Sequence, residues 1–109
     1  MYKIEVFNQK NQALAGLARA LSHPARLEIL EILADSKVCI SGDISDHIPL
    51  SRTTVSQHLK ELKEIGLIKG SVDGTKINYC LQKNTIDKMV EEFNNFFKNI
   101  QPESENDCP

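Results

Sequence analysis

The amino-acid sequence predicts a mainly α-helical fold with one small β-hairpin. Apolar residues recur at helical spacing in several segments, and residues that cap or break helices separate those segments. One stretch also holds two short strand candidates around Asp73-Gly74. A chain of 109 residues fits one domain with one hydrophobic core. We therefore expect a folded domain over residues 1–100 and a disordered acidic tail over residues 101–109.

The first two helices are predicted on either side of a break at Ser22-His23-Pro24. Apolar residues at helical spacing predict a first helix over residues 8–21. Ser or His can cap the next helix, and proline is tolerated in its first turn, so a second helix is predicted over residues 24–34. The residues of this helix expected to face inward are Leu27, Ile29, Leu30 and Leu33.

A short third helix and a longer fourth helix follow. The third is predicted near residues 42–47, and Pro49 ends it. The fourth is predicted over residues 52–65. Ser51 is a favourable N-cap for it, and Gly66 stands where a left-handed residue commonly ends a helix.

A hairpin and a last helix complete the chain. Strands are predicted over residues 67–72 and 76–81, because Asp73-Gly74 favours a two-residue turn, whereas residues 35–41 are predicted as a loop. A long helix is predicted from about Thr85 to Ile100. A short helix, a capped helix and then a hairpin form the pattern of a winged helix-turn-helix. The predicted order is therefore α-α-α-α-β-β-α, in a dimer.

The fourth predicted helix has two chemically different sides. Val55, Leu59 and Leu62 share one side, which predicts that this side packs on the core. The opposite side carries hydroxyl and amide groups, which suit base edges and phosphates, and acidic residues occur only in the C-terminal half. A plain amphipathic surface helix is the alternative. We predict that this helix binds double-stranded operator DNA. The predicted DNA-binding residues are Ser51, Arg52, Thr53, Thr54, Ser56, Gln57, His58 and Lys60, with Lys69 and Lys76 in the hairpin. His58 stands on the flank of the core side, so a mainly structural role is the alternative to a phosphate contact.

The distribution of charge fits a nucleic-acid binder better than the net charge does. The formal net charge is −2 at pH 7, but without the tail carboxylates of Glu103, Glu105 and Asp107 it is +1. Residues 52–83 hold six Lys and Arg against three Asp and Glu. A dimer would double this positive region, and local positive potential guides association with DNA.

The last predicted helix carries a broad apolar stripe that one small domain cannot cover. A large exposed apolar surface normally marks a partner, and the simplest partner is a second copy with the first helix beside it. We therefore predict a homodimer. The predicted dimerisation residues are Leu14, Leu17, Met89, Phe93, Phe96 and Phe97.

Composition predicts neither a cofactor nor an enzyme. Cys39, Cys80 and Cys108 are odd in number, far apart and without a Cys-x-x-Cys pair, so reduced thiols are expected. No catalytic constellation is recognisable. Residues 1–7 alternate charged and apolar side chains, which fits neither a signal peptide nor a membrane span, and we expect a cytoplasmic protein without membrane contacts.

Two motifs resemble the ArsR/SmtB family of bacterial repressors. The first is Ala20-Leu21-Ser22-His23-Pro24-Ala25-Arg26-Leu27-Glu28-Ile29-Leu30. The second is Leu50-Ser51-Arg52-Thr53-Thr54-Val55-Ser56-Gln57-His58-Leu59-Lys60-Glu61-Leu62, followed by Glu64-Ile65-Gly66-Leu67-Ile68. The resemblance covers about residues 12–82. It implies a homodimer that binds operator DNA, represses transcription and often releases the DNA when an effector binds.

The chain departs from the family pattern in its hairpin and its metal motifs. The family's hairpin is commonly rich in arginine, whereas Ser71-Val72-Asp73-Gly74-Thr75 leaves mainly Lys69 and Lys76. One metal motif of the family, Cys-Val-Cys-Asp-Leu, places its cysteines at Ile40 and Gly42, so Cys39 is one residue out of place. The other uses Asp and His pairs on the last helix, and residues 83–100 contain no His. We expect no metal at either site, and the effector stays open.

Two further hypotheses stay open. In one, DNA binding is retained and Cys39 and Cys80 form a thiol sensor for a soft metal or an oxidant. In the other, the chain is a winged-helix protein-interaction module without DNA binding. The poorly charged hairpin and the negative net charge favour this second hypothesis.

Overall fold

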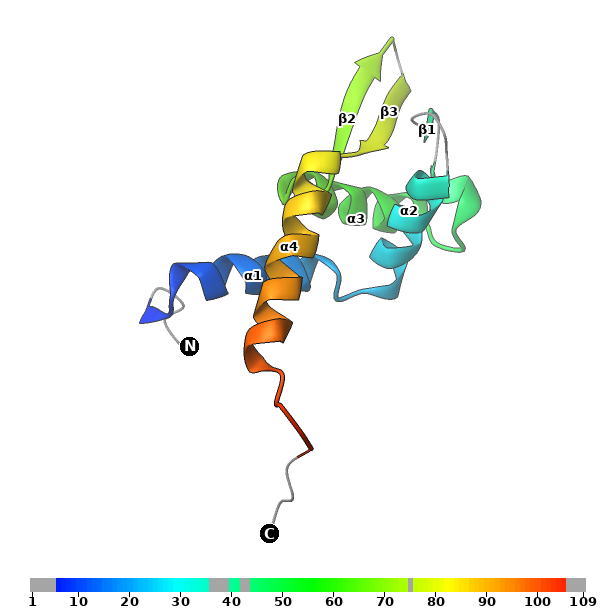
Figure 1. The fold of residues 1–109 in the computed structure, drawn as a ribbon. Helices are drawn as coiled ribbons and strands as arrows, with labels where there is room; N and C mark the ends of the chain where they lie inside the picture. Colours follow the sequence, from blue (N-terminus) through cyan, green and yellow to red (C-terminus); the bar gives the residue numbers. More distant parts are fainter. Residues whose placement is uncertain (1–5, 36–39, 42–43, 75, 106–109) are drawn as a thin grey trace.

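The computed structural model describes residues 6–35, 40–41, 44–74 and 76–105 of the chain. Helices, a small sheet and one short 3-10 helix follow in the order shown in Figure 1. The elements are α1 (Gln9–Ala20), α2 (Pro24–Asp35), β1 (Ile40–Ser41), η2 (Ile44–His47), α3 (Arg52–Glu64), β2 (Ile68–Asp73), β3 (Lys76–Leu81) and α4 (Lys83–Ile100). The long helix α4 leads away from the sheet and contacts α1 (Figure 1).

One hydrophobic core joins the helices to the hairpin. The most deeply buried side chains come from α2, η2, α3 and the start of the hairpin. They are Ile29, Ile44, Val55, Leu62, Leu67 and Ile68. Burial of such side chains supplies the main driving force for folding, and here it fixes α3 between α2 and the hairpin. Within the described ranges, no helix combines the length and the apolar character that a membrane crossing requires.

Local signals in the sequence define both ends of α3. Ser51 caps the helix, because its hydroxyl oxygen accepts the backbone N–H of Thr54 at 3.2 Å. Beyond Ile65 the chain turns at Gly66, whose φ of 87° is strained for any residue with a side chain. The predicted cap and the predicted left-handed glycine are both confirmed.

The sheet has three strands rather than two. Antiparallel strands β2 and β3 form the predicted hairpin, and β1 adds to the outer edge of β3 with Ile40 opposite Tyr79. Treating residues 35–41 as loop was therefore wrong for the last two. A two-residue strand carries no alternation in sequence, because its pairing depends on a partner far along the chain. The turn also starts one residue later than predicted, at Gly74 (φ 66°), since Asp73 pairs with Lys76.

The helix boundaries agree with the predictions to within two residues, with one change of type. The predicted third helix is a single 3-10 turn over Ile44–His47. On α2, Leu27 is 43% exposed, so its predicted inward position was wrong. Ala25, Ile29 and Leu33 recur every four residues and define the buried side, and Leu27 lies two residues from it, on the opposite side of the helix.

Candidate nucleic-acid interface

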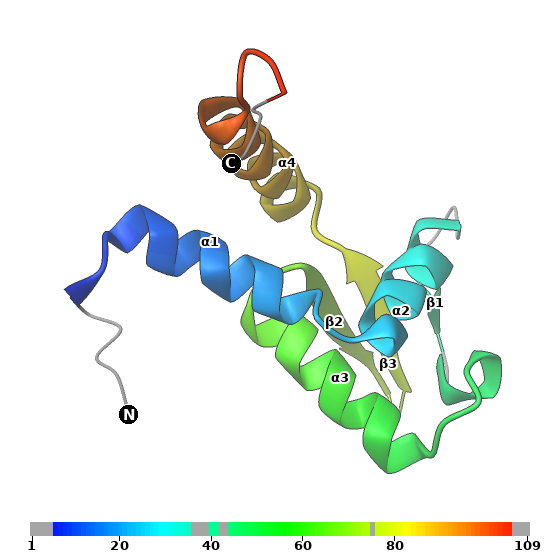
Figure 2. The ribbon, with the colours of Figure 1, turned by 90° about the horizontal axis from the view of Figure 1, so that it is seen from below.

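Helix α3 presents a polar side to solvent and an apolar side to the core. Val55, Leu59 and Leu62 are buried. The exposed residues on the other side are Thr53, Ser56, Gln57 and Lys60. In Figure 2, α3 lies at the edge of the fold, on the side opposite α4. These four predicted DNA contacts are therefore accessible together, on one surface.

The N-terminal end of α3 is electropositive. Its first turn contains no acidic residue, and the exposed Arg52 begins the helix. The aligned peptide dipoles add partial positive charge at this end, where a phosphate can bind. Ser51 and Thr54 hydroxyls lie 3.0 Å apart and hydrogen-bond to each other. These two groups shape the helix end, because the Ser51 hydroxyl also accepts the backbone N–H of Thr54.

His58 does not belong to the exposed side of α3. Its side chain is 8% exposed and packs toward α2, where its Nδ1 accepts a hydrogen bond from Arg26 Nε at 3.1 Å. Burial lowers the pKa of His58 below its ordinary value of 6.5, and the nearby His23 and Arg26 lower it further. We therefore remove His58 from the predicted DNA contacts. At 100° per residue it stands beside the buried residues rather than opposite them.

The other two histidines lie at the ends of helical segments. His23 Nδ1 accepts the backbone N–H of Ala25 at 3.0 Å, which caps the first turn of α2. His47 is exposed at the end of η2.

The hairpin offers little positive charge near α3. Lys69 is exposed on β2, whereas the side chain of Lys76 lies outside the described part of the structure. Val72 is 78% exposed and stands opposite Ile77, which is 43% exposed. The hairpin therefore exposes an apolar pair that the sequence analysis did not single out. Alternation places Val72 on the same face of β2 as the buried Ile68, so it gave no signal of this exposure.

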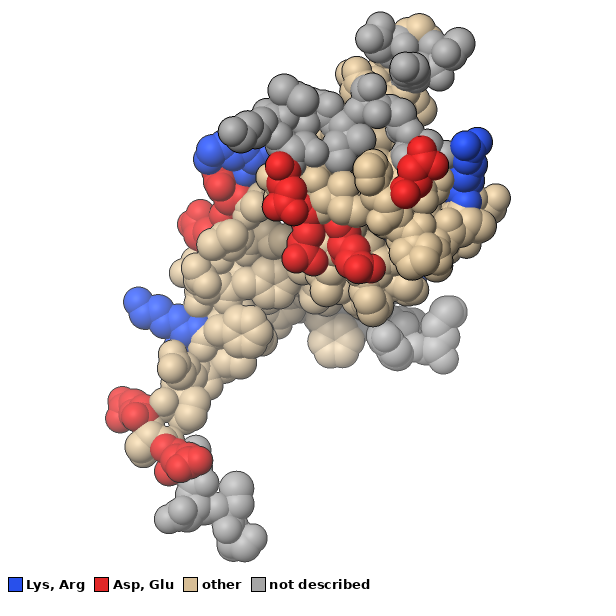
Figure 3. All heavy atoms as spheres, turned by 90° about the vertical axis from the view of Figure 1, so that its right-hand side faces the viewer, with Lys and Arg blue, Asp and Glu red and all other residues tan. Residues whose placement is uncertain are grey.

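A second face of the molecule is acidic. Figure 3 shows carboxylates gathered on this face, where Glu28, Glu31 and Asp35 of α2 are exposed. A surface of this charge repels the phosphates of DNA.

Helices α1 and α4 expose an apolar surface of their own. Val90, Phe97 and Ile100 are each more than half exposed, and Phe96 is 37% exposed. A groove of about 440 Å³ lies between the two helices. Its lining is mostly apolar and includes Leu14, Ala18, Phe93, Phe96 and Phe97. Met89 is 8% exposed and belongs to the core, so its predicted place in the dimer contact was wrong.

The thiol predictions need one correction. Cys80 on β3 is disulfide-bonded, which contradicts the expectation of a reduced thiol. Cys39 and Cys108 lie outside the residues that the structure describes. Among the described residues, no three His, Cys, Asp or Glu side chains are grouped so that they could hold a metal ion.

These features define a class of protein: a winged helix-turn-helix DNA-binding protein, in which an exposed polar helix follows a short helical turn and precedes a hairpin. The chain matches the family model for bacterial regulatory proteins of the arsR family over residues 23–69. It is 36% identical over 83 residues to the HTH-type transcriptional regulator CmtR of Mycobacterium tuberculosis (strain ATCC 25618 / H37Rv). The matched segment covers 76% of this chain and 70% of CmtR.

Comparisons with two other proteins indicate the same family. The arsenical resistance operon repressor of Staphylococcus aureus is 32% identical over 81 residues, 74% of this chain and 77% of the repressor. The structure of an ArsR-like transcriptional regulator from Rhodococcus sp. RHA1 superposes with a TM-score of 0.70 at 25% identity, covering 84% of this chain and 86% of that one. The chain belongs to the ArsR family of bacterial regulatory proteins. It is therefore a transcriptional regulator and not an enzyme.

Proposed function

We propose that the protein is a cytoplasmic, homodimeric repressor that binds double-stranded operator DNA with α3 of each copy. One observation carries this proposal: α3 buries Val55, Leu59 and Leu62 and exposes a continuous row of hydroxyl, amide and amine groups. Arginine suits guanine, glutamine suits adenine, and serine or threonine suits either base or phosphate. An α-helix of this kind fits the major groove of B-DNA.

Each exposed residue receives a role within this proposal. Arg52 and Gln57 read base edges, and Thr53 and Ser56 contact a base or a phosphate. Lys60 and Lys69 contact phosphates, as does Lys76 by its position in the hairpin. The low positive charge of the hairpin leaves α3 as the main source of affinity.

The dimer forms through α1 and α4 in this proposal. The apolar groove between these helices and the exposed Val90, Phe96 and Phe97 form one surface, and an apolar surface of this kind normally has a partner. A two-fold dimer would present two α3 helices to successive major grooves, about 34–36 Å apart, on a near-palindromic site. We propose that residues 101–109 form a separate acidic tail.

DNA binding is tested by selection and salt titration. The purified protein is mixed with fragments of its source genome, the retained fragments are sequenced, and binding to them is followed by electrophoretic shift. We expect a near-palindromic site and, at about six phosphate contacts per dimer, a log–log salt slope near −5. If no fragment is retained and only a protein partner is captured, the chain is an interaction module and this proposal is wrong.

The proposal includes no metal at the two usual family sites. The last helix offers only carboxylates where the family uses Asp and His pairs, and soft or borderline metals prefer thiolate or imidazole clusters. Adding zinc or cadmium should therefore leave operator binding unchanged once the thiols are blocked by alkylation. Release of DNA by metal under that condition would show a site elsewhere.

The disulfide of Cys80 favours a second candidate, a thiol-responsive repressor. The chain has three cysteines, so within one chain the partner of Cys80 is Cys39 or Cys108. An oxidant such as diamide takes two electrons from the two thiols, both protons leave, and the sulfur–sulfur bond forms. In this candidate the operator affinities of the diamide-treated and dithiothreitol-treated proteins differ.

Single serine variants separate the possible partners of Cys80. Peptide mapping shows which cysteine Cys80 joins. Two variants, Cys80→Ser and the serine variant of its partner, should each bind operator with the same affinity in diamide and in dithiothreitol. The serine variant of the remaining cysteine should keep the wild-type response. Equal affinity of the wild-type protein in both reagents would remove this candidate.

A further inference from the structure

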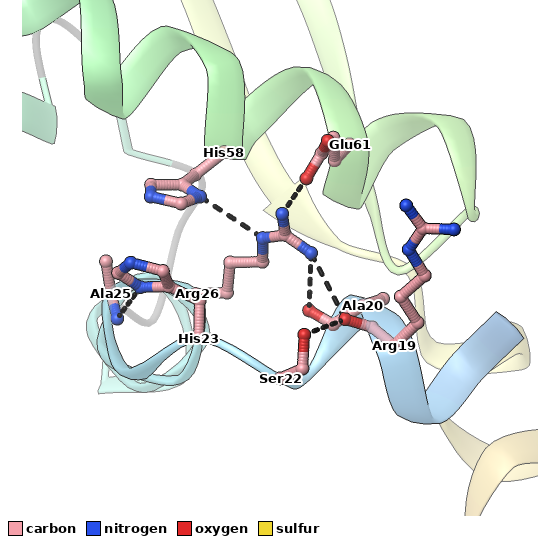
Figure 4. Close-up of polar contacts among 8 residues, drawn as sticks. All are labelled: Arg19, Ala20, Ser22, His23, Ala25, Arg26, His58 and Glu61. Carbon is pink, nitrogen blue, oxygen red and sulfur yellow. Dashed lines mark hydrogen bonds and ion pairs between the residues drawn. The ribbon is translucent and has the colours of Figure 1, made fainter. Parts of the chain in front are cut away.

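Arg26 joins three helices at the back of the DNA-facing helix (Figure 4). From α2, its guanidinium Nε donates to His58 Nδ1 at 3.1 Å, and another nitrogen forms an ion pair with Glu61, both on α3. Its remaining nitrogen donates to the carbonyl oxygens of Arg19 at 3.2 Å and Ala20 at 3.5 Å, at the end of α1. We name Arg26, His58 and Glu61 the Arg26 cluster.

The Arg26 cluster has the geometry to control the rotation of α3. His58 and Glu61 are three residues apart and lie one above the other on α3. A planar guanidinium that contacts both leaves α3 little freedom to turn about its axis. The apolar contacts of Val55 and Leu62 are non-directional and hold the helix without fixing its rotation as tightly.

Rotation of α3 matters because its DNA-facing residues are interleaved with the Arg26 cluster. Gln57 precedes His58, and Lys60 precedes Glu61. Neighbouring residues on α3 are fixed about 100° apart around the helix axis. A rotation of the helix that moves His58 therefore moves Gln57 by the same angle. The Arg26 side chain itself is 14% exposed, which keeps the contact with His58 out of bulk water.

We propose that Arg26 is a positioning residue for DNA recognition: with His58 and Glu61 it sets the rotation of α3, and protonation of His58 releases that hold. This inference rests on the proposed function, since it assigns a role to a residue that does not itself face DNA. It identifies a contact whose loss lowers operator affinity without removing any group that touches DNA.

The chemistry of His58 explains the release. Because Nδ1 accepts from Arg26, the single proton of the neutral ring is on Nε2, which is buried and has no hydrogen-bond partner among the described residues. A second proton would go to Nδ1. It would turn the acceptor into a donor, directly facing the Arg26 N–H, and place two positive charges side by side.

Groups from three helices affect the protonation of His58. From the start of α2, His23 packs its ring on His58 with centroids 4.5 Å apart, and Arg26 adds its charge. From α3, Glu61 is 52% exposed and already paired with Arg26, so it offsets little of the repulsion. From α1, the backbone carbonyls of Arg19 and Ala20 accept hydrogen bonds from Arg26 and hold it in place. Burial lowers the pKa of His58 most, and the neighbouring His23 and Arg26 lower it further.

The first test compares Arg26→Gln and Arg26→Lys with wild type on the selected operator at pH 7.5. Glutamine removes both the positive charge and the planar guanidinium, whereas lysine keeps the charge but has no guanidinium to donate several hydrogen bonds at once. We expect the operator affinity of Arg26→Gln to fall by about tenfold, which is the effect of losing a hydrogen bond to a charged group. The affinity of Arg26→Lys should fall less. Circular dichroism and sedimentation report folding and dimer formation for each variant.

The second test follows operator affinity from pH 8 to pH 5.5 in His58→Asn. The Asn side-chain oxygen replaces Nδ1 as acceptor and does not titrate. We expect wild-type affinity to fall by at least about threefold as His58 gains its proton, and His58→Asn to bind like wild type at pH 8 without that fall. His47→Asn, at an exposed histidine, and His23→Asn, which preserves a cap acceptor, should both keep the fall.

The outcomes separate this inference from the proposed function. If the wild-type protein binds no operator, the proposed function fails, and the inference fails with it. If wild type binds and Gln57→Ala weakens binding, but His58→Asn retains the wild-type fall at low pH, the inference alone is overturned. An Arg26→Gln protein that is folded, dimeric and as tight as wild type also overturns it. Should Arg26→Gln not fold, the profile of His58→Asn decides.

Discussion

Gln57 and Arg52 are the residues on which operator recognition depends most directly in this proposal. Both are exposed near the N-terminal end of α3, where the helix dipole adds positive charge. Their side chains are long enough to reach base edges and have two adjacent hydrogen-bonding groups, the pattern that distinguishes guanine and adenine in the major groove. Their neighbours Ser51 and Thr54 bond to each other and stabilise the helix end instead.

Replacing Gln57 or Arg52 with Ala should weaken operator binding by about 1–3 kcal/mol, because each truncation removes a base-reading contact. Fluorescence anisotropy with the selected operator measures the loss, and binding to a scrambled duplex should change less for Gln57→Ala. The control is Lys98→Ala, an exposed cation in the last turn of α4. Unchanged operator affinity in both α3 variants would contradict the assignment of this helix.

His58 gives the folded protein a pH dependence of its own. Its pKa is below 6.5 in the folded state, first through burial and then through His23 and Arg26, whereas the unfolded chain has the ordinary value. The unfolded state therefore binds more protons as pH falls past 6.5, so unfolding becomes easier. The contribution of neutral His58 to stability is complete above pH 6.5 and is lost as pH falls toward the lowered pKa.

We expect the free energy of unfolding in urea to fall more steeply from pH 7 to pH 5 in wild type than in His58→Asn. The comparison removes the contribution of the carboxylates, which titrate in both proteins. His47→Asn serves as the matched control, since His47 is exposed. Parallel stability curves for wild type and His58→Asn would show that His58 does not change its charge on unfolding in this range.

At the scale of elements, α3 is held by its ends as well as by its core side. Ser51 caps its start, and Gly66 allows the sharp turn that leads into β2 directly after its C-terminal end. Gly66 lies at φ 87°, a conformation that costs a residue with a side chain about 1–2 kcal/mol. An added Cβ would also lie 3.4 Å from Thr85 Oγ1, within ordinary contact. The backbone conformation therefore decides the effect of a substitution here.

Two glycine substitutions of opposite sign test this turn. Gly66→Ala should lower the free energy of unfolding by about 1–2 kcal/mol. Gly16→Ala, inside α1, should raise it by about 0.5–1 kcal/mol, since alanine loses less backbone entropy and the nearest atom, Ile65 Cδ1, is 3.9 Å away. Chemical denaturation measures both. A Gly66→Ala protein as stable as wild type would mean that the turn relaxes.

The elements differ in how well their sequences predict them. The cap of α3, its faces and the hairpin strands have strong local signals, so they are found where expected. The edge strand β1 and the exposure of Leu27 do not, because both depend on which part of the fold lies opposite. His58 and Met89 also needed the structure: His58 stands beside the DNA-facing side of α3 and is buried, and Met89 lies on the predicted apolar stripe of α4 where that stripe packs on the core of its own chain. The disulfide of Cys80 had no signal in cysteine spacing.

At the scale of the whole molecule, the proposed DNA surface and the apolar surface of α1 and α4 lie apart. The extents of the chain are 59 × 33 × 27 Å, and Figure 2 shows α4 and α3 on opposite sides. A second copy could therefore cover Phe96 and Phe97 without blocking the polar side of α3. Dimer formation and DNA binding need not compete in this arrangement.

Phe97→Asp should raise the concentration at which the dimer dissociates by at least about tenfold, because burial of a phenylalanine is worth about 1.5–3 kcal/mol. Phe97 is 58% exposed in one chain, so this change should leave the monomer folded. Val72→Asp in the hairpin, 78% exposed, is the control. Analytical ultracentrifugation over a dilution series gives both constants. Equal dissociation of Phe97→Asp and wild type would place the dimer contact elsewhere.

The sequence alone determined the class of the fold and the polar side of the DNA-facing helix, because helical periodicity, caps and turn residues act between near neighbours. Two family motifs within it also predicted a regulator. Only the tertiary structure decided that His58 faces Arg26, that Met89 is in the core and that β1 completes the sheet. Each of these depends on residues distant in sequence, and burial and pairing exist only after the chain has folded.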